Sequence, residues 1–273
     1  MPKALVINPN TSPAMTAEIE ATARRVFSGD WDCAVHHAPG GPESLESWYD
    51  YHLATVCVLP LVLQSPQPCD GILLACFGDP GIFALKEIAT VPLIGIAEAS
   101  MSLALLSGGK FGILAGMRRA IELMDSMVRT YGLEARYAGC ESLDMRVLSF
   151  DAEPERTLET LVACAERLRA RGADVILLGC AGLTAFVDRF QERMAMPVID
   201  PVEAGCRMLK TVVEQRLQVS HAGIYTRPAL QQLNNLSELF SARMQSVLPK
   251  AYGEPDDFSS KSARPFRKAN KAA

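Results

Sequence analysis

The sequence predicts an α/β protein made of two pseudo-symmetric halves, each built on a parallel sheet, with a site in the cleft between them. Residues 70–78 (DGILLACFG) recur as residues 174–182 (DVILLGCAG), and six of the nine positions are identical. Residues 92–99 are echoed in the same order at 197–204. Motifs repeated at nearly constant spacing indicate an internal duplication. Strand and helix patterns alternate along both halves, as in flavodoxin-like sheets.

The composition indicates a globular protein. The 273 residues are 49% hydrophobic, which is ample for a core, and the net charge of -4 argues against nucleic acid as a partner. No segment reaches the roughly 18 uninterrupted apolar residues of a membrane span. The apolar stretch near the start is too short for a signal peptide, so we expect a cytoplasmic protein with no membrane partner.

The chain contains eight cysteines and four histidines. Without a secretion signal, the cysteines are expected to be reduced thiols. No Cys-x-x-Cys pair occurs, and the histidines do not have zinc-ligand spacing relative to the cysteines. The sequence therefore predicts no metal site.

The first half is expected to begin with a strand over 4–7, a polar loop and a helix over 14–26. Ser12 as N-cap followed by Pro13 is a typical helix start. Asn8 and Asn10 lie at the carboxyl end of the strand, where ligands bind in open α/β sheets, and both are therefore candidates for substrate binding.

A second strand over 33–37 leads into a loop rich in proline and glycine, and a long helix is expected from Ser44 to about Leu63. Its aromatic side chains are assigned to packing rather than to chemistry: Trp48, Tyr49, Tyr51 and His52. The first repeated strand follows. Asp79-Pro80 then predicts the N-cap and first position of a helix that reaches about Ala89.

The second half continues this alternation. We expect a strand over 91–96, a helix from about residue 97, a strand over 111–114, a helix over 118–131, strands over 135–137 and 145–148, and a helix over 153–170. After the second repeated strand and Pro201, a helix reaches about residue 218, with a weaker strand over 222–225 and a helix over 227–248. We assign residues 1–97 plus 206–248 to the first half, 98–205 to the second, and 249–273 to a disordered tail.

Each repeated strand is followed by a cysteine, Cys76 in the first copy and Cys180 in the second. A cysteine between a strand and a helix N-terminus lies at the positive end of the helix dipole, which favours the thiolate. Gly78 and Gly182 let the backbone approach a ligand closely, and the neighbouring amides can hold negative charge that develops on an oxygen.

Two cysteines from pseudo-symmetric halves are expected to approach a small substrate from opposite sides. A thiolate on one can remove a proton from a carbon next to a carbonyl, while a thiol on the other delivers a proton to the opposite face. This inverts a stereocentre without a cofactor and works in both directions, as a racemase requires. The alternative is a disulfide between the two cysteines, which the expected compartment disfavours.

At these residues the chain resembles the aspartate/glutamate/hydantoin racemase superfamily, over about residues 3–226. Four motifs place it closest to the hydantoin and allantoin racemases: residues 8–12, 76–81, 95–99 and 179–182. The resemblance implies a cofactor-independent racemase in which Cys76 and Cys180 are the acid/base pair. It also implies that Asn10 and the loop of Phe77, Gly78 and Asp79 contact a ring substrate, that Ala181 and Gly182 adjoin it, and that the protein is a homo-oligomer.

One segment departs from this pattern, because residues 115–117 read Ala-Gly-Met where that branch generally has threonine or serine to help bind the substrate. The leading hypothesis is inversion of C5 in a 5-substituted hydantoin or in allantoin. The alternatives are a decarboxylase, a cis-trans isomerase, a racemase of free aspartate or glutamate, and a small-molecule binding protein without catalysis. Racemases of free amino acids typically have Asn-Thr after the first cysteine, where this chain has Phe77 and Gly78.

Overall fold

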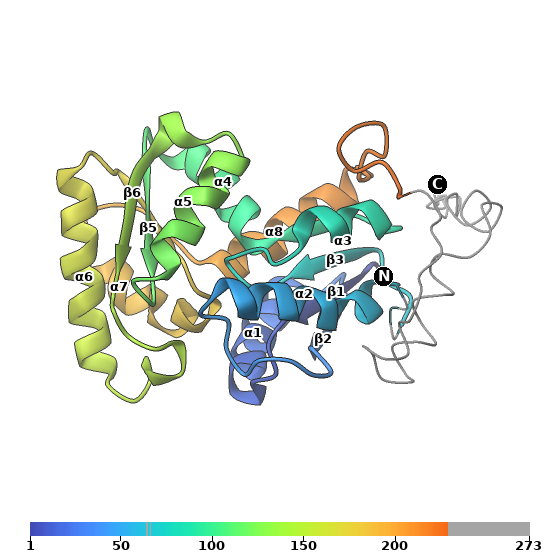
Figure 1. Ribbon diagram of the computed structural model, residues 1–273, viewed down its shortest axis with the longest axis horizontal. Coiled ribbons are helices and arrows are strands. Elements are labelled where there is room, and N and C mark those ends of the chain that lie inside the picture. The colour runs from blue at the N-terminus through green and yellow to red at the C-terminus, as the bar shows by residue number, and fades with distance from the viewer. Residues whose placement is uncertain (64, 66, 229–273) are drawn as a thin grey trace.

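The structure is a computed structural model that describes residues 1–63, 65 and 67–228. These residues form two four-stranded parallel sheets that carry helices (Figure 1). The strand order is β2-β1-β3-β4 in the first sheet and β6-β5-β7-β8 in the second, so both halves follow one topology. The predicted α/β fold with two pseudo-symmetric halves is therefore confirmed.

The first half contains seven of the described elements: β1 (Lys3–Asn8), α1 (Pro13–Val26), β2 (Asp32–His37), α2 (Trp48–Leu63), β3 (Gly71–Leu74), α3 (Ile82–Ile88) and β4 (Leu93–Gly95). β1 lies between β2 and β3, and β3 lies between β1 and β4. β3 is buried along its whole length, as its unbroken apolar sequence predicts for a strand covered on both faces. The expected N-cap of α1 is confirmed, since the Ser12 hydroxyl accepts a hydrogen bond from the Met15 backbone N–H.

The second half repeats the order through α4 (Ile96–Ser107), β5 (Phe111–Ala115), α5 (Ala120–Thr130), β6 (Tyr137–Ser142), α6 (Pro154–Ala170), β7 (Val175–Leu178), α7 (Val187–Arg193) and β8 (Val198–Ile199). Short 3-10 helices occur at η1 (Glu134–Arg136), η2 (Val147–Ser149) and η3 (Ala181–Phe186). The chain then returns along α8 (Pro201–Glu214), which contacts β3 and β4 of the first sheet.

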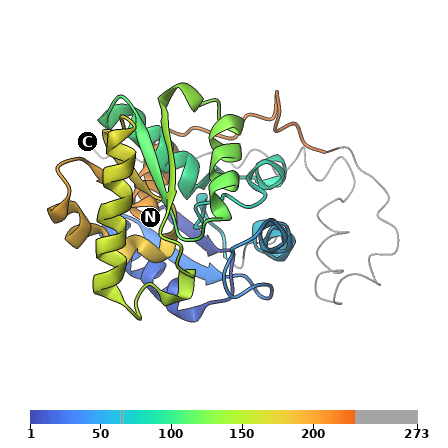
Figure 2. The same cartoon turned by 60° about the vertical axis from the view of Figure 1, so that its left-hand side comes forward.

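The two halves share part of their core. α4 and α8 contact each other and lie between the two sheets, with α4 against β7 and α8 against β3 (Figures 1 and 2). One apolar cluster includes side chains of β1, α4, β5, β7 and α8. Two further clusters lie under α2 and α3 in the first half and under α6 and α7 in the second. Because burial of apolar area stabilises the shared cluster, it also holds the two cysteine-bearing strand ends in a defined arrangement.

Several expected elements differ from those observed. The strand expected over 135–137 begins later, because residues 134–136 form the 3-10 turn η1 and β6 spans Tyr137–Ser142. The strand expected over 145–148 is wrong, because its second part belongs to the 3-10 turn η2. The backbone N–H of Val147 donates to the Glu46 carboxylate of the other half, so this segment is engaged by a side chain and not by a neighbouring strand. Residues 221–225 form turns where a strand was expected. The helix expected over 227–248 lies almost wholly outside the described residues, as does the tail over 249–273.

The start of α3 also differs. The helix begins at Ile82, and the residue before it is Gly81 with φ of 70°, so Asp79 is not its N-cap. Asp79 itself has φ of 41° and directs its carboxylate to the N-terminus of α4. Asp79 therefore caps α4, a helix distant in the sequence, and not the helix that follows it directly.

Candidate active site

A pocket lies where the carboxyl ends of β3 and β7 face each other, and both repeated cysteines line it. The space between its walls is about 510 Å³, including the part open to solvent. Five lining residues carry polar or thiol groups: Asn10, Glu46, Tyr51, Cys76 and Cys180. The rest are apolar side chains or glycines: Met15, Leu45, Ala75, Phe77, Gly116, Met117, Ala120, Met124, Val147, Gly179 and Ala181.

The structure divides the predicted site residues into two groups. Cys76, Cys180, Asn10, Phe77 and Ala181 line the pocket. The other four do not line it and instead support those that do: Asn8, Gly78, Asp79 and Gly182. The supporting role of each follows from its contacts.

Asn8 positions Asn10. The buried Asn8 side-chain amide donates to Asn10 Oδ1 at 2.7 Å and to the Thr16 hydroxyl at 3.0 Å. The Asn10 side-chain amide in turn donates to the sulfur of Met15 at 2.9 Å. A thioether is a weak acceptor, so the Asn10 Nδ2 group is the lining amide most ready to donate to a ligand oxygen.

Gly78 and Gly182 hold the thiols in similar ways but meet different surroundings. The backbone N–H of each glycine donates to the sulfur of the cysteine two residues before it, and this lowers the pKa of that thiol. A Cβ on Gly78 would lie 1.8 Å from Cε1 of Tyr51, whereas one on Gly182 would meet nothing closer than 3.4 Å. Gly78 is therefore required so that the Tyr51 ring can lie against the loop.

Asp79 ties the first cysteine loop to the second half. Its carboxylate accepts from the backbone N–H groups of Ala97 and Glu98, at 3.1 and 2.9 Å, and from the Tyr131 hydroxyl at 2.7 Å. Gly95 admits this arrangement, because a Cβ there would lie 2.1 Å from Asp79 Oδ1. Burial raises the pKa of Asp79 to about 7, and the nearby charge of Glu98 adds to the rise.

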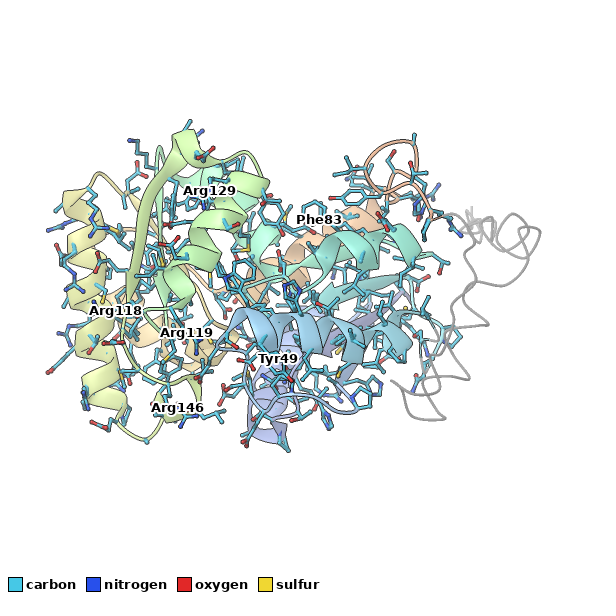
Figure 3. All side chains as sticks on the ribbon, in the orientation of Figure 1. Tyr49, Phe83, Arg118, Arg119, Arg129 and Arg146 are labelled. Carbon is cyan, nitrogen blue, oxygen red and sulfur yellow. The ribbon has the colours of Figure 1, made fainter. Side chains whose placement is uncertain are left out.

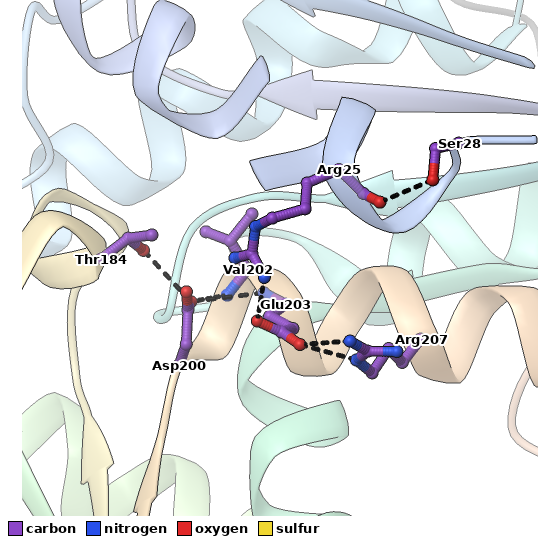
Figure 4. A network of polar contacts seen from close by, with 7 residues as sticks. All are labelled: Arg25, Ser28, Thr184, Asp200, Val202, Glu203 and Arg207. Atoms are coloured by element: carbon purple, nitrogen blue, oxygen red, sulfur yellow. Dashed lines mark hydrogen bonds and ion pairs between the residues drawn. The ribbon is translucent and has the colours of Figure 1, made fainter. Parts of the chain in front are cut away.

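The second cysteine loop is anchored in a comparable place by different residues (Figure 4). Asp200 caps α8 by accepting from Val202 N and Glu203 N, and the Thr184 hydroxyl of η3 donates to it at 3.1 Å. Glu203 joins the network by accepting from Arg25 of α1 and Arg207 of α8. In each half, then, the segment after the cysteine is held to the N-terminus of the next long helix.

Burial dominates the ionisation of the two thiols. It raises the pKa of Cys76 to about 11 and that of Cys180 to about 12. The expectation that these positions favour the thiolate is wrong, because the glycine N–H groups only partly offset the cost of desolvating a negative charge. A thiolate with a high pKa is in compensation a stronger base toward a carbon acid.

Two polar lining residues were not predicted as site residues. Tyr51 was assigned to packing, yet its hydroxyl lies 4.0 Å from Cys76 Sγ. Its spacing to Ala54 and Val58 places Tyr51 on the buried face of α2. Because a buried phenol needs a hydrogen-bond partner for its hydroxyl, this spacing is a sequence signal that could have identified Tyr51. Glu46 lies in the loop before α2, where its carboxylate accepts from Ser44 and Val147. No local pattern distinguishes Glu46 from any other loop glutamate.

Positive charge adjoins the pocket lining on the second half. Arg118 and Arg119 follow Met117, and Arg146 precedes Val147, and all three are exposed. Figure 3 shows them on the second half, with Tyr49 on α2 of the first. Arg118 pairs with Asp144 at 3.7 Å, and Arg146 with Glu46 at 3.9 Å. Ion pairs of exposed arginines at such distances are weak, so Arg118 and Arg146 remain available to other anions.

All eight cysteines are free thiols, including Cys76 and Cys180. Across residues 1–63, 65 and 67–228, no group of three or more histidine, cysteine or acidic side chains could hold a metal ion. None of the described helices has the length and apolarity needed to cross a membrane.

Comparisons with known proteins agree on one family. The model of the Asp/Glu/Hydantoin racemase family matches residues 5–209. A hydantoin racemase from Pseudomonas sp. (strain NS671) is 34% identical over 228 residues, covering 83% of this chain and 92% of that protein. An allantoin racemase structure from Klebsiella pneumoniae superposes with a TM-score of 0.80 at 32% identity, covering 90% of this chain and 99% of that one. The allantoin racemase from Pseudomonas fluorescens gives a TM-score of 0.81 at 28% identity, covering 85% and 99%.

Proposed function

The chain belongs to the Asp/Glu/Hydantoin racemase family, and on that premise we propose that it inverts C5 of a hydantoin-type substrate by proton transfer between Cys76 and Cys180. One observation carries the proposal: the cysteines that end two repeated strands line a single pocket from opposite halves of the molecule. Each thiol is also held by a backbone N–H, so both are oriented before a ligand binds.

The proposed reaction uses one thiolate and one thiol. The C5–H bond of a hydantoin is acidic because the adjacent carbonyl accepts the electron pair as an enolate. One thiolate takes this proton and becomes a thiol, and the facing thiol gives its proton to the other side of C5 and becomes a thiolate. The protonation states of the pair are thereby exchanged, and the same steps in reverse convert the opposite enantiomer.

The lining suggests how the ring is held. In this proposal Asn10 Nδ2 donates to an enolate oxygen, and the Glu46 carboxylate accepts from a ring N–H; both residues line the pocket. Three lining methionines, Met15, Met117 and Met124, provide an adaptable apolar wall for the C5 substituent. The Glu46 charge disfavours free glutamate or aspartate, which would bring two carboxylates into the pocket.

The test is hydrogen exchange at C5 of single-enantiomer hydantoins and allantoin in deuterated water, followed by NMR and polarimetry. We expect the wild-type protein to incorporate deuterium and abolish optical rotation. Cys76→Ser and Cys180→Ser should each lose racemisation by at least about 100-fold, because positioned acid/base groups contribute on that order. Cys33→Ser is the matched control, since this half-buried thiol in β2 does not line the pocket.

The outcomes separate the readings. Loss of racemisation in both pocket variants but not in Cys33→Ser supports the two-thiol mechanism. Racemisation that survives either pocket substitution contradicts it while leaving the substrate class intact. If the wild-type protein neither exchanges nor racemises any of these compounds, or turns over free glutamate faster, the hydantoin assignment is wrong.

A further inference from the structure

The hydroxyl of Tyr51 lies beside one of the two thiols. Tyr51 is 8% exposed, and its oxygen is 4.0 Å from Cys76 Sγ. Within the described part of the chain, that thiol is the only hydrogen-bond partner of this hydroxyl. Tyr51 also carries the only hydroxyl among the pocket-lining side chains that the structure describes.

The fold fixes the Tyr51 ring at this place. The Ser47 hydroxyl accepts from Asp50 N at the start of α2, and Tyr51 N donates to the Ser47 carbonyl in the first turn. The ring then lies over Gly78, where even one added carbon would overlap it. Because both the start of α2 and the Gly78 loop restrain the ring, the Tyr51 hydroxyl stays close to Cys76.

The second thiol has different neighbours. Cys180 receives the Gly182 N–H just as Cys76 receives that of Gly78. Tyr51 is close enough to interact electrostatically with both thiols, but among the described residues its hydroxyl is hydrogen-bonded only to Cys76. The charged groups that face Cys180 are the carboxylates of Glu18 in α1 and Glu46 in the loop before α2. Cys76 faces one carboxylate, Asp79, whose oxygens are occupied by two backbone N–H groups and the Tyr131 hydroxyl.

We propose that Tyr51 is a positioning residue that makes Cys76 the resting base of the pair and leaves Cys180 as the resting acid. In the neutral pair the Cys76 thiol donates to the Tyr51 oxygen. When Cys76 loses its proton, the phenol rotates its O–H toward the sulfur and donates to the thiolate. Hydrogen bonds to a charged acceptor are stronger than those between neutral groups, so this reversal stabilises the ionised form of Cys76 alone.

The charge environment supports the same order. For Cys76, the Gly78 N–H and then the Tyr51 hydroxyl lower the pKa against burial and the charge of Asp79. For Cys180, the Gly182 N–H lowers the pKa against burial and the charges of Cys76, Glu18 and Glu46. The two cysteines occupy equivalent positions in the sequence repeat, but their thiols are therefore expected to ionise at different pH. The assignment to base and acid rests on the proposed function, but the difference in thiol ionisation does not.

The first test needs no substrate. Wild-type protein and Tyr51→Phe are treated briefly with iodoacetamide from pH 7 to 11, and the modification rates of Cys76 and Cys180 are measured by peptide mass spectrometry. With thiol pKa values of about 11 and 12, the rate for Cys76 should level off toward the top of this range while that for Cys180 still rises, and a midpoint raised by one pH unit lowers the rate tenfold at every lower pH. We expect Cys76 to have the lower midpoint in the wild type, and Tyr51→Phe to raise it by about one pH unit, a tenfold loss of thiolate.

Tyr49→Phe is the matched control, because Tyr49 is in the same helix but is 75% exposed (Figure 3). It should leave both midpoints unchanged. A wild-type protein in which Cys180 ionises first, or a Tyr51→Phe protein with an unchanged Cys76 midpoint, contradicts the proposal. Since phenylalanine keeps the ring over Gly78, equal urea unfolding of the two proteins shows that lost packing is not the cause.

The second test uses racemisation. Tyr51→Phe should lower kcat by about tenfold with little change in KM, and should move the rising limb of the kcat/KM profile to higher pH. A purely structural role for Tyr51 would lower kcat without moving the profile. If the hydantoin assignment fails but the iodoacetamide midpoints behave as expected, the role of Tyr51 stands and only the identity of the substrate is lost.

Discussion

Gly78 and Gly182 occupy equivalent positions in the two repeats, yet their surroundings give them different tolerances. Both donate a backbone N–H to a thiol. Only Gly78 has a buried aromatic ring where its side chain would be, while the space at Gly182 is bounded by Met15, Val147 and Phe150 at ordinary contact distances. The Tyr51 ring therefore requires glycine at position 78, whereas the space at position 182 admits a small side chain.

This difference predicts unequal effects of one substitution. Gly78→Ala should displace the Tyr51 ring and cut racemisation by about 100-fold, because small misplacements of catalytic groups can cost that much. Gly182→Ala should stay within about threefold of wild type. Racemisation rates and Cys76 alkylation midpoints measure both effects. Equal losses in the two variants would show that the ring over Gly78 has no special importance.

At the scale of elements, the N-termini of α4 and α8 hold the two cysteine loops in place. Asp79 caps α4 from the first loop, and Asp200, reached by Thr184 of the second loop, caps α8 (Figure 4). Helix N-terminal N–H groups have no partner within the helix, so a carboxylate that accepts them stabilises both the helix and the loop that carries it. The site is thus built on the ends of two central helices.

Asp79 gives a stability prediction for this arrangement. Asp79→Ala should lower the free energy of unfolding by about 2 kcal/mol, since it leaves the N–H groups of Ala97 and Glu98 and the Tyr131 hydroxyl without their acceptor. Asp79→Asn should cost less, because asparagine can accept from the amides and tolerates the positive φ. Urea unfolding measures both, and an alanine variant as stable as wild type would rule out the capping role.

The direction of the Asp79 pKa shift also predicts how the stability difference between Asp79→Asn and wild type depends on pH. Burial raises the Asp79 pKa from 3.8 to about 7, so the folded state holds this proton more tightly than the unfolded state. The associated stability is present below about pH 4 and is lost as the pH rises through 7. The difference in unfolding free energy between Asp79→Asn and wild type should therefore shift in favour of the variant between pH 4 and 8.

At the scale of the whole molecule, the two halves are joined by polar contacts beside the shared core. Tyr131 reaches Asp79, Glu46 accepts from Val147, and Glu18 of α1 shares a hydrogen bond with Asp151, which precedes α6. The last contact joins two carboxyl groups, so it holds only when one carries a proton. Burial, and then the charge of Asp151, raise the pKa of Glu18 to about 7.

This carboxyl pair should make the contact between the halves sensitive to pH. Because the folded pKa of Glu18 lies above its ordinary value of 4.5, its contribution to stability is complete below that value and is lost as the pH rises through about 7. Glu18→Gln keeps a donor without the charge, so it should unfold at higher urea than wild type at pH 8 and not at pH 4.5. Glu20→Gln, in the same helix, is the control. Parallel pH profiles for wild type and Glu18→Gln would contradict this.

Part of this protein follows directly from its sequence. The repeated apolar strands, each followed by a cysteine, predict two parallel sheets with two thiols at strand ends, and the structure has both. This is possible because strand burial and helix capping depend on local patterns, such as the unbroken run in β3 or Ser12 before α1. Duplication then extends the prediction from one half to the other.

What the tertiary structure decided are the contacts between residues far apart in the chain. Tyr51 meets Cys76, Asp79 meets the start of α4 and Tyr131, and Glu46 meets Val147 of the other half. None of these pairs leaves a local pattern, because each side chain satisfies its hydrogen bonds with whatever the fold brings beside it. The thiol ionisation was misjudged for the same reason: it depends on how deeply the two halves bury the pocket, and burial is a property of the assembled core.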